Sequence, residues 1–363
     1  MNSASEFQRL LAGVRELEAA NFAQRAALAT IVRTHGSTFR RAGASMLVRE
    51  DDRIVCSLSG GCPENDIITR ARHVMATDLA ELARYNDESA GDVLFEAGCG
   101  GELDVLIEPL VNAADTQFLS MLAQMHTQRR AGFMATVYAL QSAPLRPRPQ
   151  RLIWNDALTW SDVDDAGLVD AILAAGAAAP TQRAFAQSIE TAHGVCDVLF
   201  ESVSPVHALA IVGANPAALA IARGACALGW KALLVDSRDP PPALPDQAYF
   251  IKATPATVLD KVPLDAHSSV LVMTFNIERD CEWLQALAAA PLAYFGAIGS
   301  RERAARMHAS VAHTGARLHA PAGLDIGSET PEEIAVAVIA EILAVLNSRD
   351  GGSLGRSARS IHP

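Results

Sequence analysis

The sequence lacks an excess of basic residues and any apolar run long enough to cross a bilayer. Its 30 Lys and Arg against 41 Asp and Glu give a formal net charge of −11. Few cations are therefore available to replace the counterions of a nucleic acid. The first ten residues, MNSASEFQRL, have neither the basic segment nor the apolar segment of a secretory signal. We expect a cytoplasmic protein whose main activity involves neither nucleic acid nor a membrane.

Several signatures of catalytic and metal centres are also missing. The sequence contains no HExxH, Gly-x-Ser-x-Gly or Walker A motif. None of its six cysteines forms a Cys-x-x-Cys pair, which argues against a zinc knuckle or a thioredoxin-type centre. In a reducing compartment these cysteines are expected to be thiols, and most of them to fill buried apolar positions.

The most informative stretch that is present is a glycine-rich turn, SLSGGCPE, over residues 57–64. A helical pattern over about residues 63–84 follows it. Gly60 and Gly61 let the backbone approach a ligand closely, and their N–H groups can point at an anion beside a helix N-terminus. The same surroundings favour the thiolate of Cys62, the reactive form. The alternative is a turn cysteine kept for packing.

Two further polar turns surround this one in the sequence. The turn GCGG, residues 98–101, carries Cys99 and Gly100 ahead of an apolar run over residues 103–107. It forms either a second wall of the same cleft or a tight turn that lets two strands pass. Arg40 lies in the turn between residues 34 and 43, and its guanidinium suits a phosphate group.

The pattern changes near residue 204. Continuous apolar strands now alternate with helices, which predicts a doubly wound parallel sheet of the Rossmann type. Gly213 opens the first strand–helix turn, and Asp236 follows the second strand, where such folds hold a ribose hydroxyl. Rossmann-like folds often bind no nucleotide, so a purely structural role for both residues stays open. We therefore predict a mixed α/β domain over residues 1–203, a Rossmann-like domain over 204–347 and a flexible tail over 348–363.

Several motifs together resemble the XdhC/CoxI family of accessory proteins for molybdenum hydroxylases. They cover nearly the whole chain, and the longest is APAGLDIGSETPEEIAVAVIAEI, residues 320–342. The others are Gly36-Ser37 with Arg40, Gly43-Ala44-Ser45-Met46, Gly60-Gly61-Cys62 with Glu64, Gly98-Cys99-Gly100-Gly101 with Glu108-Pro109, Tyr294-Phe295-Gly296 and Gly299-Ser300-Arg301.

The resemblance implies a cytoplasmic chaperone, usually a homodimer. Such a protein binds molybdenum cofactor, as molybdopterin or its dinucleotide, while a cysteine desulfurase supplies the terminal sulfur. It then passes the cofactor to the apo-enzyme of a xanthine dehydrogenase or aldehyde oxidoreductase type. In the family, the cysteine of the Gly-Gly-Cys turn is the candidate for contact with the cofactor, and in this sequence that residue is Cys62.

Four positions depart from the family pattern. Ser59 replaces a glycine, and Pro63 removes one N–H group from the first turn. Asn215 stands where a second glycine is usual, and it fills space where a pyrophosphate would lie. The run over residues 273–276, MTFN, lacks a histidine that often follows its threonine. The last two departures, which lie in the second domain, count against tight NAD(P) binding there.

Three hypotheses follow from the sequence. The first is a molybdenum cofactor chaperone that turns over no substrate of its own. The second is an NAD(P)-dependent oxidoreductase with Cys62 as a catalytic thiol in a cleft between the domains. The third is a scaffold that recruits the cysteine desulfurase and the target enzyme without holding cofactor.

Overall fold

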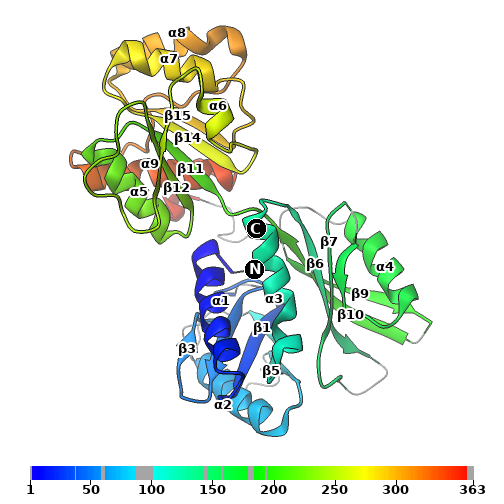
Figure 1. Cartoon of the computed structure of the whole chain (residues 1–363). Helices are drawn as coiled ribbons and strands as arrows, with labels where there is room; N and C mark the ends of the chain where they lie inside the picture. Colours follow the sequence, from blue (N-terminus) through cyan, green and yellow to red (C-terminus); the bar gives the residue numbers. More distant parts are fainter. Residues whose placement is uncertain are drawn as a thin grey trace. The chain divides into compact units, whose positions relative to one another are not determined.

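The computed structural model describes residues 2–36, 38–58, 62–86, 101–141, 145–156, 158–178, 184–192 and 194–357, apart from the side chains of Cys62, Leu158 and Thr159. The chain forms two compact units, Met1–Pro205 and Val206–Pro363 (Figure 1). No helix among these described residues is both long and apolar enough to span a bilayer.

The first unit contains two antiparallel sheets. Sheet A has the strand order β3-β2-β1-β5-β4, and sheet B has the order β8-β7-β6-β10-β9. The strands of sheet A are β1 (Ala26–His35), β2 (Ser45–Arg49), β3 (Ile54–Val55), β4 (Glu81–Tyr85) and β5 (Glu102–Leu110). Those of sheet B are β6 (Gly132–Leu140), β7 (Gln150–Trp154), β8 (Leu158–Ser161), β9 (Phe185–Thr191) and β10 (Gly194–Val203).

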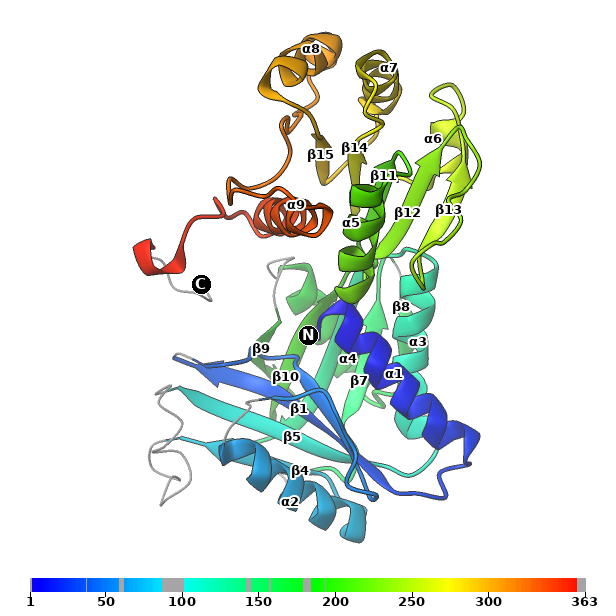
Figure 2. The same cartoon turned by 90° about the vertical axis from the view of Figure 1, so that its left-hand side faces the viewer.

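Helices cover both faces of sheet A (Figure 2). Apolar side chains of α2 (Cys62–Thr77) pack on one face, among them Ile67 and Val74. The opposite face packs against α1 (Ala4–Ala19) and α3 (Ala113–Thr127), whose buried residues share a core with strands of both sheets. The short helix α4 (Ala166–Ala177) packs on sheet B. Both faces of sheet A are therefore covered by helices, and the loops lie at the ends of its strands.

The helix predicted over residues 63–84 was too long. It ends at Thr77 as α2, and Asp78 takes a left-handed conformation with φ +56°. The following residues 81–85 form β4, which pairs with β5. Pairing with a distant strand thus overrides the local helical pattern.

The second unit is the predicted doubly wound sheet. Its five strands are parallel in the order β13-β12-β11-β14-β15. They are β11 (Ala208–Val212), β12 (Lys231–Asp236), β13 (Tyr249–Lys252), β14 (Ser268–Val272) and β15 (Tyr294–Ala297). The reversal of strand order between β11 and β14 creates a switch point, where ligands of such sheets bind.

Helices flank this sheet on both faces, as Figure 1 shows. One core contains α5 (Pro216–Ala227) and α9 (Pro331–Leu346). The other contains α6 (Val258–Lys261), α7 (Ile277–Leu287) and α8 (Arg301–Val311). Short 3-10 turns follow at Ala312–Thr314 and Leu354–Arg356. The predicted flexible tail is described only as far as Ser357.

Candidate functional site

The segments around both glycine–cysteine turns meet at one end of sheet A. The last residue of β1, His35, pairs with Glu102, the first residue of β5. The last residue of β4, Tyr85, pairs with Leu103. Glu102, directly after the turn at residues 98–101, and Tyr85 therefore lie at the end of sheet A from which the loop with Arg40 leaves β1. We call this end, formed by residues 35–36, 38–44, 56–58, 62–66, 85–86 and 101–102, the loop end of sheet A.

Helix α2 begins at the same end. The Tyr85 hydroxyl donates a hydrogen bond of 2.8 Å to Oδ2 of Asp66, in the second turn of α2. Arg70 donates to the same carboxylate oxygen at 2.6 Å. Burial opposes the charge of Asp66, but these two hydrogen bonds outweigh it and lower the pKa of the carboxyl. This contact fixes the start of α2, and with it Cys62, against the end of β4.

Glu64 holds the two flanks of the Gly-Gly-Cys turn together. Its Oε2 accepts hydrogen bonds from the Ser57 hydroxyl at 2.5 Å and from the Leu58 backbone N–H at 3.2 Å. Leu58 is buried in the core beneath α2. The residues of the turn itself, including Gly60 and Gly61, lie outside the described residues, as does the Cys62 side chain. Glu64 therefore links the strand side of the turn to the helix side.

Arg40 is already engaged by a carboxylate. Its guanidinium makes a bidentate ion pair with Glu6, with Nη1–Oε1 at 2.6 Å and Nη2–Oε2 at 2.9 Å. Glu6 also accepts from the backbone N–H of Ser3 in the capping box of α1. Burial opposes ionisation of Glu6, but the bonds from Arg40 and Ser3 lower its pKa to about 2. A phosphate bound to Arg40 would have to compete with this pair.

Acid is expected to weaken the Glu6–Arg40 pair. The pKa of Glu6 falls from 4.5 to about 2 on folding, so its contribution is present above pH 4.5 and is lost as the pH falls toward 2. Both side chains are partly exposed, which limits the contribution to about 1–2 kcal/mol. Denaturant unfolding of wild type and Arg40→Met should differ by this amount near neutral pH, and the difference should vanish in acid. A difference that does not change with pH would exclude this origin.

Cys56 places a thiol at the loop end of sheet A, although the sequence predicts that most of the cysteines fill buried apolar positions. It has a left-handed backbone, with φ +67°, and its thiol lies 3.5 Å from the Glu6 carbonyl oxygen, to which it donates. Burial raises the pKa of this thiol, although Arg9 and Arg40 oppose the shift. Cys56 is therefore held as a neutral thiol, in contrast to the thiolate predicted for Cys62.

Gly213 and Asp236 lie at the carboxyl ends of neighbouring strands in the second unit, as predicted, but each has internal partners. Gly213 has φ +116°, and a Cβ there would lie 2.7 Å from the Met273 carbonyl oxygen. Asp236 is 1% exposed and accepts from Arg238 through Nε at 3.1 Å and Nη2 at 2.7 Å. Burial opposes the charge of Asp236, but the bonds from Arg238 lower its pKa.

Asn215 caps the first helix of this unit. Its Oδ1 accepts from the Ala218 backbone N–H at 3.0 Å, and its Nδ2 donates to the Met273 carbonyl oxygen at 2.7 Å. The helix N-terminus that would face a pyrophosphate therefore carries its own cap. Together with the Asp236–Arg238 pair, this cap gives internal partners to the helix N-terminus and the carboxylate that a Rossmann site normally offers to a dinucleotide.

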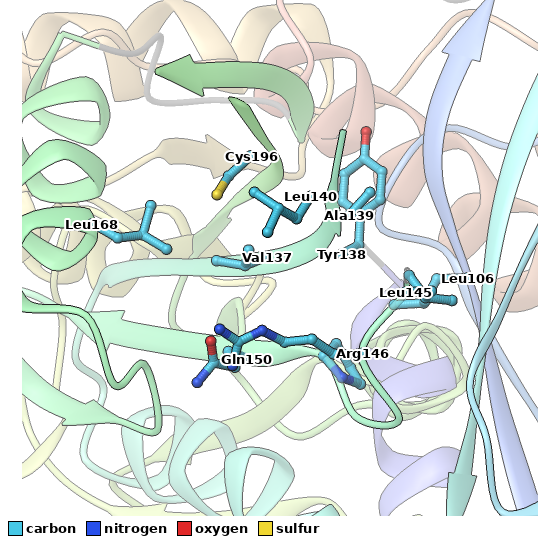
Figure 3. A pocket seen from close by; sticks show the side chains of 11 residues that line it. Leu106, Val137, Tyr138, Ala139, Leu140, Leu145, Arg146, Gln150, Leu168 and Cys196 are labelled. Carbon is cyan, nitrogen blue, oxygen red and sulfur yellow. The ribbon is translucent and has the colours of Figure 1, made fainter. Parts of the chain in front are cut away.

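Two cavities in the first unit are lined by none of the predicted site residues, although Gly43, at the loop end of sheet A, lines the larger one. Figure 3 shows the smaller one, of about 30 Å³, which is lined by Cys196, Leu168 and Arg146 among others. Its volume suits about one water molecule. The other, of about 40 Å³, lies in the core between the two sheets. Within the described part of the chain, no group of three or more His, Cys, Asp or Glu side chains could hold a metal ion.

Comparison with known proteins identifies matches in both units. Residues 209–342 match the model of the XdhC Rossmann domain, and residues 20–86 match that of the XdhC and CoxI family. A Bacillus subtilis protein, named as one of the probable subunits of xanthine dehydrogenase, is 28% identical over 333 residues, which are 88% of this chain and 93% of that protein.

Two more relatives agree with these matches. The Escherichia coli molybdenum cofactor insertion chaperone PaoD is 30% identical over 131 residues, 36% of this chain and 40% of PaoD. A crystal structure from Bacillus halodurans, described as a xanthine dehydrogenase, superposes with a TM-score of 0.73 at 26% identity, over 95% of this chain and 98% of that one. The motifs, the architecture and these matches agree, and the chain belongs to the XdhC and CoxI family.

Proposed function

We propose that this protein binds molybdenum cofactor at the loop end of sheet A and delivers it to a molybdenum hydroxylase. It protects the cofactor during sulfuration and turns over no substrate of its own. The relative named as a molybdenum cofactor insertion chaperone supports a role in cofactor maturation. The relative named for xanthine dehydrogenase supports the class of target enzyme.

One observation carries the choice of site. Strand pairing brings Tyr85 and Glu102 to the end of sheet A where α2 begins, and Glu102 directly follows the turn at residues 98–101. The loop with Arg40 leaves β1 at this same end. Described flanks of three polar, glycine-containing segments therefore lie at one end of sheet A, which supports a binding site assembled there from loops.

Each predicted residue has a role in this proposal. Backbone N–H groups of Gly60, Gly61 and Gly100 bind the phosphate of the cofactor. The thiolate of Cys62 lies near the molybdenum or its sulfur ligand, because a soft thiolate suits that contact better than an oxygen ligand. Cys99 forms the facing wall. Arg40 leaves its ion pair with Glu6 and makes a charge-assisted hydrogen bond to the phosphate instead.

The partners in this proposal follow from the chemistry of the cargo. A cysteine desulfurase supplies the terminal sulfur, and the apo-enzyme of the hydroxylase receives the completed cofactor. The cargo is molybdopterin or its dinucleotide. A cytoplasmic location and a homodimer stay predictions.

The contacts of the second unit count against a dinucleotide-dependent oxidoreductase. In such an enzyme the carboxylate after the second strand accepts from a ribose hydroxyl, and the first helix N-terminus faces a pyrophosphate. Here the Asp236 carboxylate already accepts from Arg238, and the Asn215 side chain already caps α5. We therefore propose that Gly213 and Asp236 shape the turn and its neighbour without holding NAD(P) in the ordinary Rossmann manner.

Glu64→Ala is expected to reduce cofactor retention by about tenfold or more, because the flanks of the turn lose their link. The two lost hydrogen bonds should lower stability by only about 1–3 kcal/mol. Glu64→Gln is the matched control, since its amide oxygen can accept both bonds. Bound cofactor per purified chain is the measurement. Equal retention by Glu64→Ala and wild type would show that the link has no role in binding.

A transfer assay tests the proposed function. Purified full-length protein, loaded with molybdenum cofactor, should activate an apo-form molybdenum hydroxylase, and NAD(P)H should bind weakly or not at all. Tight NAD(P)H binding without cofactor retention would favour the oxidoreductase. Capture of the apo-enzyme without either ligand would favour the scaffold. Either result would overturn the chaperone.

A further inference from the structure

Phe275 is an exposed aromatic residue in an unfavourable backbone conformation. It follows β14 in the second unit, its φ is +63°, and its side chain is 59% exposed. A bulky residue rarely adopts a left-handed conformation, because its Cβ crowds the following backbone. The conformation costs free energy, and the exposed side chain gains little from burial in this unit to compensate for it.

Local packing at the start of α7 does not account for Phe275. The residue precedes the N-cap Asn276, a position where an apolar side chain often packs on the fourth helical residue. Here that residue is Asp280, which is fully buried and accepts from the Thr274 hydroxyl at 2.6 Å and from Arg303 at 2.6 Å. A charged, fully bonded carboxylate cannot serve as the apolar partner of Phe275.

The place of Phe275 in the sheet is where open α/β sheets bind ligands. Its strand, β14, lies between β11 and β15. The turn after β11 approaches so closely that a Cβ on Gly213 would lie 3.3 Å from the Thr274 Cα atom. Phe275 therefore lies just after the strand that borders the switch point, at the carboxyl edge of the sheet.

Arg279 brings a positive charge to the same edge. It belongs to the first turn of α7, yet its Nη2 donates to the Ser237 hydroxyl at 2.9 Å and lies 3.5 Å from Oδ1 of Asp236. Since β11 lies between β12 and β14, this side chain must cross the carboxyl end of β11. Arg238 already pairs with Asp236, so the charge of Arg279 exceeds what that carboxylate neutralises. The Arg279 side chain is 34% exposed and can meet an anion from solvent.

We propose that this edge binds a nucleoside monophosphate, with the base stacked on Phe275 and the phosphate on Arg279. Aromatic side chains stack on any base, and a guanidinium pairs with phosphate through two parallel hydrogen bonds. NADPH should gain no additional contact there, because Asn215 already caps α5 and Arg238 already pairs with Asp236, the groups that would hold its pyrophosphate and ribose. This inference does not depend on the proposed function, since it uses only contacts of the second unit.

Calorimetric titration of the full-length protein with AMP and UMP tests this site, with adenosine, inorganic phosphate and NADPH as comparison ligands. AMP should bind more tightly than UMP, because its base offers more stacking area, and NADPH no more tightly than AMP. Phe275→Ala should weaken AMP binding about tenfold, and Phe275→Trp should restore it. Arg279→Met should weaken AMP binding about tenfold and leave adenosine binding unchanged.

Tyr249→Ala is the matched control. Tyr249 is 57% exposed, but it is the first residue of β13 and so lies at the amino ends of the parallel strands, away from the proposed site at their carboxyl ends. Its replacement should leave AMP binding unchanged. The proposal is overturned if neither AMP nor UMP binds with a Kd below about 1 mM. It is also overturned if Phe275→Ala binds AMP as wild type does, or if that variant changes only the oligomeric mass in light scattering.

Discussion

Glu108→Gln is expected to lower the free energy of unfolding of residues 1–205 by about 3–5 kcal/mol. Glu108 and Arg151 form a buried ion pair between β5 and β7, and they are only 1% and 5% exposed. The guanidinium carbon also lies 3.8 Å from the centre of the Phe118 ring. Removal of the carboxylate charge would leave a buried cation without its counter-ion, and that desolvation cost is the source of the loss.

The double variant Glu108→Leu with Arg151→Met separates this explanation from simple loss of contacts. It removes both charges and keeps apolar volume. Its free energy of unfolding should therefore exceed that of Glu108→Gln by about 2 kcal/mol or more. Hydrogen exchange of β5 and β7 amides reports the free energy of this unit without interference from the other. A loss below about 1 kcal/mol for Glu108→Gln, or a double variant as unstable as the single one, would contradict the account.

Gly213→Ala is expected to destabilise the second unit by about 2–5 kcal/mol. The backbone there has φ +116°, which side-chain-bearing residues avoid. The new Cβ would lie 2.7 Å from the carbonyl oxygen and 3.1 Å from the carbonyl carbon of Met273. These are backbone atoms of β14's end, so the clash cannot be relieved by a rotamer change.

Gly315→Ala provides the control for conformational strain without a clash. Gly315 has φ +73°, and a Cβ there would meet nothing within 4 Å. Its replacement should cost only about 1 kcal/mol. Thermal unfolding of the two variants measures the difference. Equal losses would mean that close approach to Met273 plays no part, and would reopen a ligand-binding reason for glycine at position 213.

The second unit could largely be predicted from the sequence, because its signals are local. Continuous apolar strands alternating with helices indicate a parallel sheet, and the five parallel strands confirm it. The start of α9 is an example: Thr330 accepts from the Glu333 backbone N–H, and Pro331 takes the first helical position. Such motifs need no information from distant parts of the chain.

The loop end of sheet A could be predicted only in part, because long-range pairing assembles it. The sequence marks Arg40 and the two glycine–cysteine turns but does not say that His35 pairs with Glu102. It also gives no sign that Glu6 engages Arg40, since 34 residues separate them. The role of Glu64 in linking the turn is only weakly indicated by the sequence. The one sign is the position of Glu64 in the first turn of a helix, two residues after Cys62.

The most direct test of the central claim is the amount of molybdenum cofactor that the purified protein retains with and without the Cys62 thiol. Wild type should retain cofactor in near-stoichiometric amount, and Cys62→Ser should retain about tenfold less or lower. Cys281→Ser, at a half-buried cysteine of α7, should behave as wild type. Equal retention by Cys62→Ser and wild type would contradict a cofactor site built around this thiolate.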